Sequence, residues 1–413
     1  MLDYLEQAAL EKKGPPESID RTPTQVKCFV VNVVNQRTYD ENVRSIDDKL
    51  YEAIGLCEAL NLNIVESKNI KMKNLSPSLY IGKGNLDEIK ESVQSQKIDL
   101  VYFDAHLTPV HQRNLEKYLN TKVIDRTGII IEIFALRART NEGKLQVELA
   151  HLHHQRSRLV KAWSHLERQR GGGGFIGGPG ESQKELDRRM LDTKLIRVKK
   201  DLAQVKKTRE LHRKHREKNQ LPTIALVGYT NAGKSMFFNK ITKDKVLSQN
   251  MLFATLDTTL GQVVLKNNRK ILLADTVGFI SDLPTELIAA FRATLEETLY
   301  ADVLIHVIDA SSAHYETQRQ DVYTVLKSLR ESYAFENTQT ILEVYNKFDL
   351  LDDEQQRYFA NICDMSEHKF CISSLDGKGI PSLLKHIEGL FPPHISDTYY
   401  DQYLEEPTPL KDH

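Results

Sequence analysis

The sequence lacks the features that would send a protein into or across a membrane. No apolar run in the chain approaches the roughly 18 residues that cross a bilayer. The segment 1–25 mixes acidic and basic side chains with apolar ones, whereas a secretion signal has an apolar core. We therefore expect a cytoplasmic protein without a membrane span, and a peripheral membrane contact stays open.

The sequence also has few cysteines and a small net charge. The four cysteines, Cys28, Cys57, Cys363 and Cys371, lack the paired spacing of zinc ligands and are expected to be reduced, buried thiols. The formal net charge is -1, so any attraction to nucleic acid must come from a local patch. With 413 residues the chain is too long for one ordinary domain, and we expect about two or three.

The sequence does contain a phosphate-binding loop. Residues 228–235 read Gly-Tyr-Thr-Asn-Ala-Gly-Lys-Ser and lie between an apolar strand at 223–227 and the start of a helix. The glycines let main-chain N–H groups surround phosphates at the positive end of the helix, where Lys234 reaches the β and γ oxygens and Ser235 binds Mg²⁺. The alternative is a chance Gly/Lys turn, which the flanking strand and helix disfavour.

Further motifs extend this site within a doubly wound α/β domain expected at 221–391. Asp275 and Gly278 follow an apolar strand, so the carboxylate supports Mg²⁺ while the Gly278 N–H senses the γ-phosphate. Thr255 offers a hydroxyl to the metal. The Asp349 carboxylate accepts two hydrogen bonds from guanine, which adenine cannot donate, and the segment 373–375 closes over the guanine O6. The expected nucleotide is therefore GTP.

The expected roles are assigned as follows. Lys234, Thr255 and Gly278 are the catalytic residues, and Ser235 and Thr255 are the metal ligands. The GTP-binding residues are Gly228, Tyr229, Thr230, Asn231, Ala232, Gly233, Lys234, Ser235, Phe253, Ala254, Thr255, Leu256, Asp257, Asp275, Thr276, Val277, Gly278, Asn346, Lys347, Phe348, Asp349, Ser373, Ser374 and Leu375. The strands expected to carry them are 223–227, 271–274, 303–308, 341–345 and 370–372.

Upstream of this domain, apolar strands and periodic helices alternate. After a mobile tail at 1–25, the segment 26–138 predicts a small parallel-sheet α/β domain. Its expected strands are 26–34, 63–65, 100–104 and 122–125, with helices over 46–60, up to about 93, and over 112–119. Gly82 and Gly84 form either a ligand cradle or a plain turn.

Residues 139–220 predict a basic helical hairpin. Two heptad runs, 139–168 and 182–217, should pack antiparallel, with Arg156 in a slot that is otherwise apolar. The loop 171–180 between them holds seven glycines around Phe175 and Ile176, and is either a flexible connector or a tip that meets a partner. The second helix is either a solvated face or a contact for nucleic-acid phosphates, and its basic residues are Lys194, Arg197, Lys199, Lys200, Lys206, Lys207, Arg209, Arg213, Lys214, Arg216 and Lys218.

The ordered motifs are those of the small-GTPase (TRAFAC) superfamily, and nearly the full length of the chain resembles the HflX family of ribosome-associated GTPases. The resemblance is carried by the segments 125–127, 131–134, 146–150, 178–183 and 275–284. It implies a Ras-like P-loop GTPase domain after the hairpin, with a short acidic and aromatic tail at 392–413. It also implies a stress-response protein that binds the large (50S) ribosomal subunit and its rRNA and dissociates stalled or idle 70S ribosomes. The other interpretation is an assembly checkpoint on maturing 50S particles, and we expect a monomer in either case.

A few residues depart from the family pattern. Met236, Thr258 and Lys184 replace a usual threonine, proline and leucine, and none of them removes a ligand group. Phe279 stands where many related GTPases have the glutamine that orients water, so hydrolysis should be slow until a ribosomal particle is bound. Asn231 occupies a position at which some GTPases hold K⁺, which makes potassium dependence a secondary hypothesis.

Overall fold

The computed structural model describes residues 25–37, 45–169, 183–242, 252–282, 287, 297–333 and 339–392. The tip loop 171–180 and nearly all of the two terminal tails lie outside these residues. The chain forms two compact units, the first from residues 1–205 with 251–253 and 282–291, the second from the remainder. Among the described helices none is long and apolar enough to span a membrane.

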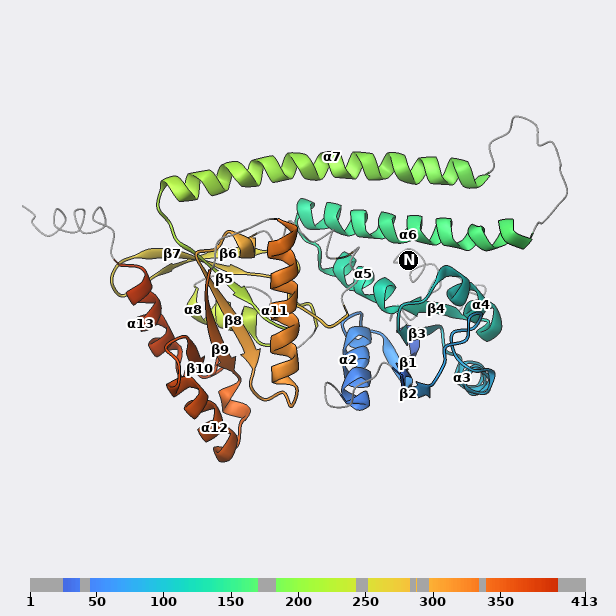
Figure 1. Cartoon of the computed structure of the whole chain (residues 1–413), viewed down its shortest axis with the longest axis horizontal. Coiled ribbons are helices and arrows are strands. Elements are labelled where there is room, and N and C mark those ends of the chain that lie inside the picture. Colours follow the sequence, from blue (N-terminus) through green and yellow to red (C-terminus); the bar gives the residue numbers. More distant parts are fainter. Residues whose placement is uncertain are drawn as a thin grey trace, which may run out of the picture. The chain divides into compact units, whose positions relative to one another are not determined.

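A parallel four-stranded sheet forms the centre of the first unit (Figure 1). Its strands are β1 (Lys27–Asn35), β2 (Asn63–Met72), β3 (Leu100–Asp104) and β4 (Lys122–Asp125), in the order β2-β1-β3-β4. The expected parallel α/β domain is therefore confirmed. The edge strand β2 continues to Met72 instead of ending at 65, because main-chain pairing with β1 extends through its polar residues.

Helices cover both faces of this sheet. Apolar residues of α3 (Lys83–Gln96) and α4 (Pro109–Leu119) pack with Phe29, Val31 and Phe103 in one core cluster. On the opposite face Cys28 of β1 contacts Cys57 of α2 (Ile46–Glu58). Gly82 is the N-cap residue of α3.

The expected hairpin is formed by α6 (Asn141–Gln169) and α7 (Gln183–Lys218), which run antiparallel (Figure 1). Their seam is apolar and contains Leu145, Leu149, Leu152, Leu191, Leu195, Val198 and Leu202. Arg156, the basic residue in the apolar pattern, pairs with Asp192 of the facing helix (Nε–Oδ1 3.0 Å). The negative charge of Asp192 thus compensates the arginine that interrupts the apolar pattern.

The second unit holds a six-stranded sheet in the order β10-β9-β8-β5-β7-β6. Its strands are β5 (Thr223–Val227), β6 (Thr259–Val264), β7 (Lys270–Asp275), β8 (Val303–Asp309), β9 (Thr340–Asn346) and β10 (Lys369–Cys371). All pairs are parallel except β6 with β7, and β6 is the strand that the sequence pattern did not indicate. The five parallel strands end at one edge, so the loops that follow them meet there.

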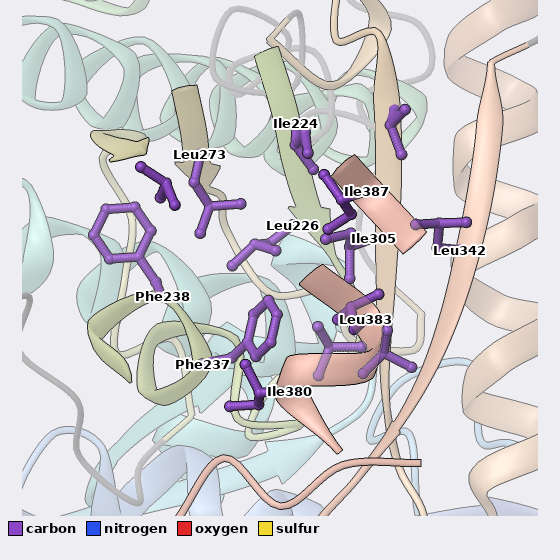
Figure 2. Packing of buried hydrophobic residues seen from close by; sticks show 14 of the residues in the cluster. Ile224, Leu226, Phe237, Phe238, Leu273, Ile305, Leu342, Ile380, Leu383 and Ile387 are labelled. Atoms are coloured by element: carbon purple, nitrogen blue, oxygen red, sulfur yellow. The ribbon is translucent and has the colours of Figure 1, made fainter. Parts of the chain in front are cut away.

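Two helices pack on one face of this sheet, α8 (Lys234–Ile241) and α13 (Ile380–Leu390). Figure 2 shows Phe237 and Phe238 of α8 and Leu383 of α13 directed toward Leu226 of β5 and its neighbours. The other face carries α11 (Tyr315–Ser332) and α12 (Asp353–Asp364), with the short 3-10 helix η1 (Phe348–Leu350) beside them. This packing fixes α8 against β5, and with it the loop between them.

Candidate nucleotide site

The loop 228–235 joins β5 to α8 and has a backbone that only glycine allows at two points. Gly228 and Gly233 have positive φ angles of 152° and 93°. A Cβ at Gly228 would collide with the carbonyl oxygen of Val307, and one at Gly233 with the side-chain amide of Asn346. Both glycines are therefore required by space as well as by dihedral angle.

Lys234 is held inside this loop. Its side chain is buried and Nζ donates to the carbonyl oxygens of Gly228 (3.1 Å) and Tyr229 (2.8 Å). Burial lowers the pKa of Lys234 to about 8, although the nearby Asp275 carboxylate opposes that shift. The amine is thus held against the main chain of the loop, with its charge only partly balanced.

Three oxygen-bearing side chains converge beside the loop. Ser235 Oγ donates to Asp275 Oδ2 (2.7 Å), Thr255 Oγ1 donates to the same oxygen (3.0 Å), and the two hydroxyls lie 2.8 Å apart. The other carboxylate oxygen, Asp275 Oδ1, is buried and has no hydrogen-bond partner. Burial raises the pKa of Asp275, while the two hydroxyls and Lys234 act against that rise.

This donor set fits Mg²⁺, which prefers hydroxyl, carboxylate and phosphate oxygens. Ser235 and Thr255 would hold the ion and Asp275 would support them, since its Oδ1 atom is buried without a hydrogen-bond partner. Bound Mg²⁺ supplies positive charge to the phosphate oxygens of a nucleotide.

The segment after β7 is fixed to the phosphate loop by its main chain. Thr230 N donates to Phe279 O (2.7 Å) and Phe279 N donates to Gly228 O (3.0 Å). A Cβ at Gly278 would press on Thr230 and on the Lys234 amine, so glycine alone fits between them. The Phe279 ring is 3% exposed, and it has no group that could orient water at the site.

At the end of the site that is expected to recognise the base, Asn346 connects two loops. Its Nδ2 donates to Ala232 O (2.8 Å), and its Oδ1 accepts from the main-chain N (3.0 Å) and Oγ (2.8 Å) of Ser374. Asn346 therefore positions the segment 373–375. Asp349 is exposed in η1, where its carboxylate is accessible to a ligand.

Two residues that the sequence reasoning missed support this end of the site. Asp309 ends β8 and pairs with Lys347 (2.7 Å), and Lys240 of α8 donates to the carbonyl oxygen of Leu375 (2.8 Å). The position of Asp309 at the carboxyl end of a parallel strand was a usable signal. Lys240 carried no such signal, because it lies 135 residues from Leu375 in the sequence.

Two of the expected GTP-binding residues lie in hydrophobic cores. Phe253 is 2% exposed and belongs to the first unit, where its ring packs edge-on against Phe134 of α5 (Arg126–Arg137), with centroids 4.8 Å apart. Phe348 packs in the core cluster with Tyr345 and Phe359. Both rings pack in hydrophobic cores, so Phe253 and Phe348 can contact a ligand through their main-chain groups only.

The basic helix α7 has two kinds of cation. Three arginines make contacts within the second unit, to which they belong: Arg216 pairs with Glu297 (3.0 Å), Arg209 approaches the same carboxylate (3.9 Å), and Arg213 stacks on the Tyr300 ring (3.6 Å). The other basic residues of the expected set, Lys194, Arg197, Lys199, Lys200, Lys206, Lys207, Lys214 and Lys218, are exposed. Glu297 and Tyr300 therefore hold these three arginines within the protein.

Three protein-family models match successive parts of the chain. Residues 47–135 match a family described as GTP-binding GTPase N-terminal. Residues 137–216 match the GTP-binding GTPase Middle Region. Residues 223–347, which contain the site described above, match the 50S ribosome-binding GTPase family.

Individual proteins agree with these matches. The chain is 48% identical over 340 residues to GTPase HflX of Magnetococcus marinus, covering 82% of this chain and 76% of that protein. It is 46% identical over 309 residues to GTPase HflX of Escherichia coli, covering 75% and 71%. A crystal structure described as a complex of SsGBP and GDP superposes with a TM-score of 0.51 at 25% identity, covering 88% of this chain and 98% of that one.

Proposed function

This chain belongs to the HflX family of GTPases and hydrolyses GTP, and from that premise we infer that GTP binding drives it to separate ribosomes into subunits. In this proposal the nucleotide occupies the loop 228–235, and the helical hairpin binds RNA of the large ribosomal subunit. Hydrolysis then resets the protein. The Ser235, Thr255 and Asp275 oxygens beside the loop support the nucleotide and metal part of the cycle.

The exposed basic face of α7 is the observation that supports binding to the ribosome. Eight lysine and arginine side chains remain at the surface of this helix after the three arginines that face Glu297 and Tyr300 are set aside. Such a row of cations on one rod suits a phosphate backbone, whose contacts carry no base specificity. The description of the family matched by 223–347, a 50S ribosome-binding GTPase, agrees with that partner.

The proposed splitting element is the loop 171–180, which lies outside the described residues. Its sequence offers seven glycines and only two large apolar side chains, Phe175 and Ile176. A main chain with so few side chains fits a narrow space between RNA walls and can displace another occupant there. The basic face of α7 would supply affinity for RNA, and the loop would compete with the other occupant of that space.

The test is a sedimentation experiment on intact ribosomes. Ribosomes are incubated with the protein and GTP, a non-hydrolysable analogue or GDP, and the fractions of whole ribosomes and free subunits are measured. Conversion to subunits with GTP and with the analogue, but not with GDP, is the expected result. Binding to large subunits with no conversion would instead favour the assembly-checkpoint function.

A Lys234→Ala protein serves as the matched control for nucleotide dependence. Its amine no longer meets the loop carbonyls or the phosphates, so it should bind no GTP and split no ribosomes. Splitting by this protein would contradict the proposal that GTP binding drives the step.

A further inference from the structure

Two cysteines of the second unit lie next to each other on different elements. Cys363 is in the last turn of α12 and Cys371 is the last residue of β10. Their Sγ atoms are 2.7 Å apart, and both thiols are free and half-buried. They border the core cluster that includes Phe348 and Phe359. No large movement is therefore needed to bring the two sulfur atoms together.

The surroundings make the two thiols unequal. The Cys371 S–H has two acceptors, the Phe359 carbonyl oxygen (3.4 Å) and the Cys363 sulfur. A hydrogen bond from Cys371 lowers the pKa of Cys363, with a smaller contribution from Lys369, against burial, Asp364 and Glu343. The same hydrogen bond, with burial, raises the pKa of Cys371. Cys363 is thus the nucleophilic partner, and Cys371 is the thiol that stays protonated.

We propose that Cys363 and Cys371 are a site of reversible oxidation by peroxides, which converts the pair to a disulfide. The Cys363 thiolate attacks a peroxide oxygen, the O–O bond breaks, and a sulfenic acid and water form once the leaving oxygen has taken up a proton. The Cys371 sulfur then attacks the Cys363 sulfur, the S–O bond breaks, and hydroxide leaves as water with the Cys371 proton. In total, two thiols and one hydrogen peroxide give one disulfide and two waters.

The disulfide would act on the base-recognition end of the site. Ile372, directly after Cys371, donates its N–H to Tyr345 O (2.9 Å) and accepts from Phe348 N (3.1 Å). Two residues further, Ser374 is bonded to Asn346, which also holds the phosphate loop at Ala232. A covalent link from α12 to the end of β10 restrains this segment, so the oxidised protein should release GDP more slowly than the reduced one.

The first unit supplies an internal control pair. Cys28 and Cys57 are both 0% exposed, with sulfur atoms 3.9 Å apart. Burial raises the pKa of Cys57, so neither access nor thiolate character favours oxidation there. The two pairs are in one protein and receive the same dose of oxidant. They differ in exposure, and the pKa is raised for Cys57 but lowered for Cys363.

The experiment is a peptide analysis of the full-length protein after limited treatment with hydrogen peroxide. Free thiols are blocked with iodoacetamide and the protein is cut with trypsin, whose sites after Arg357, Lys369 and Lys378 place the two cysteines in separate peptides. The expected product is peptide 358–369 joined to 370–378, lost on treatment with dithiothreitol, while Cys28 and Cys57 are alkylated. Two separately alkylated peptides, or joining no faster than at Cys28 and Cys57, would overturn the proposal.

The functional consequence is measured with a fluorescent GDP. Oxidation should slow its release from the natural protein and have no effect on the Cys363→Ser and Cys371→Ser single variants, whose reduced forms first have to show normal thermal unfolding. If either variant does not fold, the natural protein before and after dithiothreitol gives the same comparison. Equal release from the oxidised and reduced natural protein would overturn the proposed link to the guanine end of the site.

Discussion

At the scale of single residues, the buried amine of Lys234 makes GTP binding sensitive to alkaline pH. Its pKa of about 8 lies below the ordinary lysine value of 10.5, and the negative phosphates of GTP raise it in the complex. Between the two pKa values binding takes up a proton, so GTP affinity should fall by about tenfold per pH unit above the lower one. Below that pH, this group contributes no pH dependence.

The measurement is GTP affinity at fixed Mg²⁺ from neutral pH to about pH 9. The comparison protein is Lys234→Arg, since a guanidinium stays charged throughout this range, so any affinity it retains should show a flatter profile. The same pKa determines whether the stability of the protein rises or falls with pH. The unfolded chain binds the extra proton between about 8 and 10.5, so the nucleotide-free protein should gain stability as pH rises through that window.

Asp349 is predicted to determine the choice of base. Its exposed carboxylate offers two acceptors, which match the N1–H and 2-amino group of guanine. Asp349→Asn replaces one acceptor with a donor, which suits the 2-oxo group of xanthine. The variant should therefore lose affinity for GTP and gain affinity for xanthosine triphosphate in a competition assay. Unchanged GTP affinity would exclude this role.

Asn231 carries the prediction about potassium. It is exposed in the phosphate loop and adopts a positive φ of 63°, so its amide is accessible at the rim of the site. Phe279 is buried and cannot orient the attacking water. In this hypothesis a bound cation assists hydrolysis instead. GTP turnover should be faster in K⁺ than in Na⁺, and Asn231→Ala should remove the difference. Identical rates in the two salts would end this hypothesis.

At the scale of elements, α7 is predicted to have one face for RNA and another for its own protein. Neutralising the exposed Lys199, Lys200, Lys207 and Lys214 with glutamine should weaken binding to large subunits. The slope of log affinity against log salt should fall by about one unit per lost phosphate contact. Thermal unfolding should change little, because these side chains lie at the surface.

The matched variant on the other face is Arg216→Gln. Within the described part of the chain it leaves the buried Glu297 carboxylate with the longer Arg209 contact, so the free energy of unfolding should fall by about 1–3 kcal/mol. Its salt slope for large subunits should equal that of the natural protein. If the lysine variant keeps the natural slope while Arg216→Gln lowers it, the assignment of the two faces is wrong.

Elements with a single clear period were predictable from the sequence, and elements with a mixed pattern were not. β3 and β4 are short apolar runs and match their expected ranges, and the heptads placed both hairpin helices. The helix α5 was missed because Ile129, Ile130, Ile131 and Ile133 give a run as suitable for a buried strand as for a helix. β6 was missed because residue type does not follow burial in this edge strand: Leu260 and Val264 are exposed, whereas Gly261 is buried.

Partners far apart in the sequence were also beyond prediction. Arg126 of α5 is buried between Asp104 (2.6 Å) and Glu52 (2.5 Å), which lie 22 and 74 residues away. The motifs predicted a cluster of polar side chains at one sheet edge, and Ser235, Thr255 and Asp275 do lie together there. The motifs did not show that Asn346 is already bonded to Ala232 and Ser374, since those contacts depend on packing between loops.

At the scale of the whole molecule, α7 connects the two activities that the proposed function requires. The helix follows the loop 171–180, continues through the first unit to Val205, and ends in the second unit a few residues before β5 and the phosphate loop. In this proposal affinity for RNA, hydrolysis of GTP and splitting of ribosomes are assigned to different segments of one chain. Splitting depends on the other two, but it should be removable without loss of RNA affinity or GTP hydrolysis.

The variant that separates them replaces 171–180 with a few glycines. It keeps every exposed cation of α7 and every residue of the nucleotide site, so salt-dependent binding to large subunits and GTP hydrolysis should stay near natural levels. It lacks Phe175 and Ile176 and the length to reach a confined space, so conversion of ribosomes to subunits should be lost. A full-length loop with Phe175→Ser and Ile176→Ser is the control that separates loop length from apolar contact. Splitting by the shortened protein at the natural rate would show that the loop only connects the two helices, and that the hairpin separates subunits through its basic face alone.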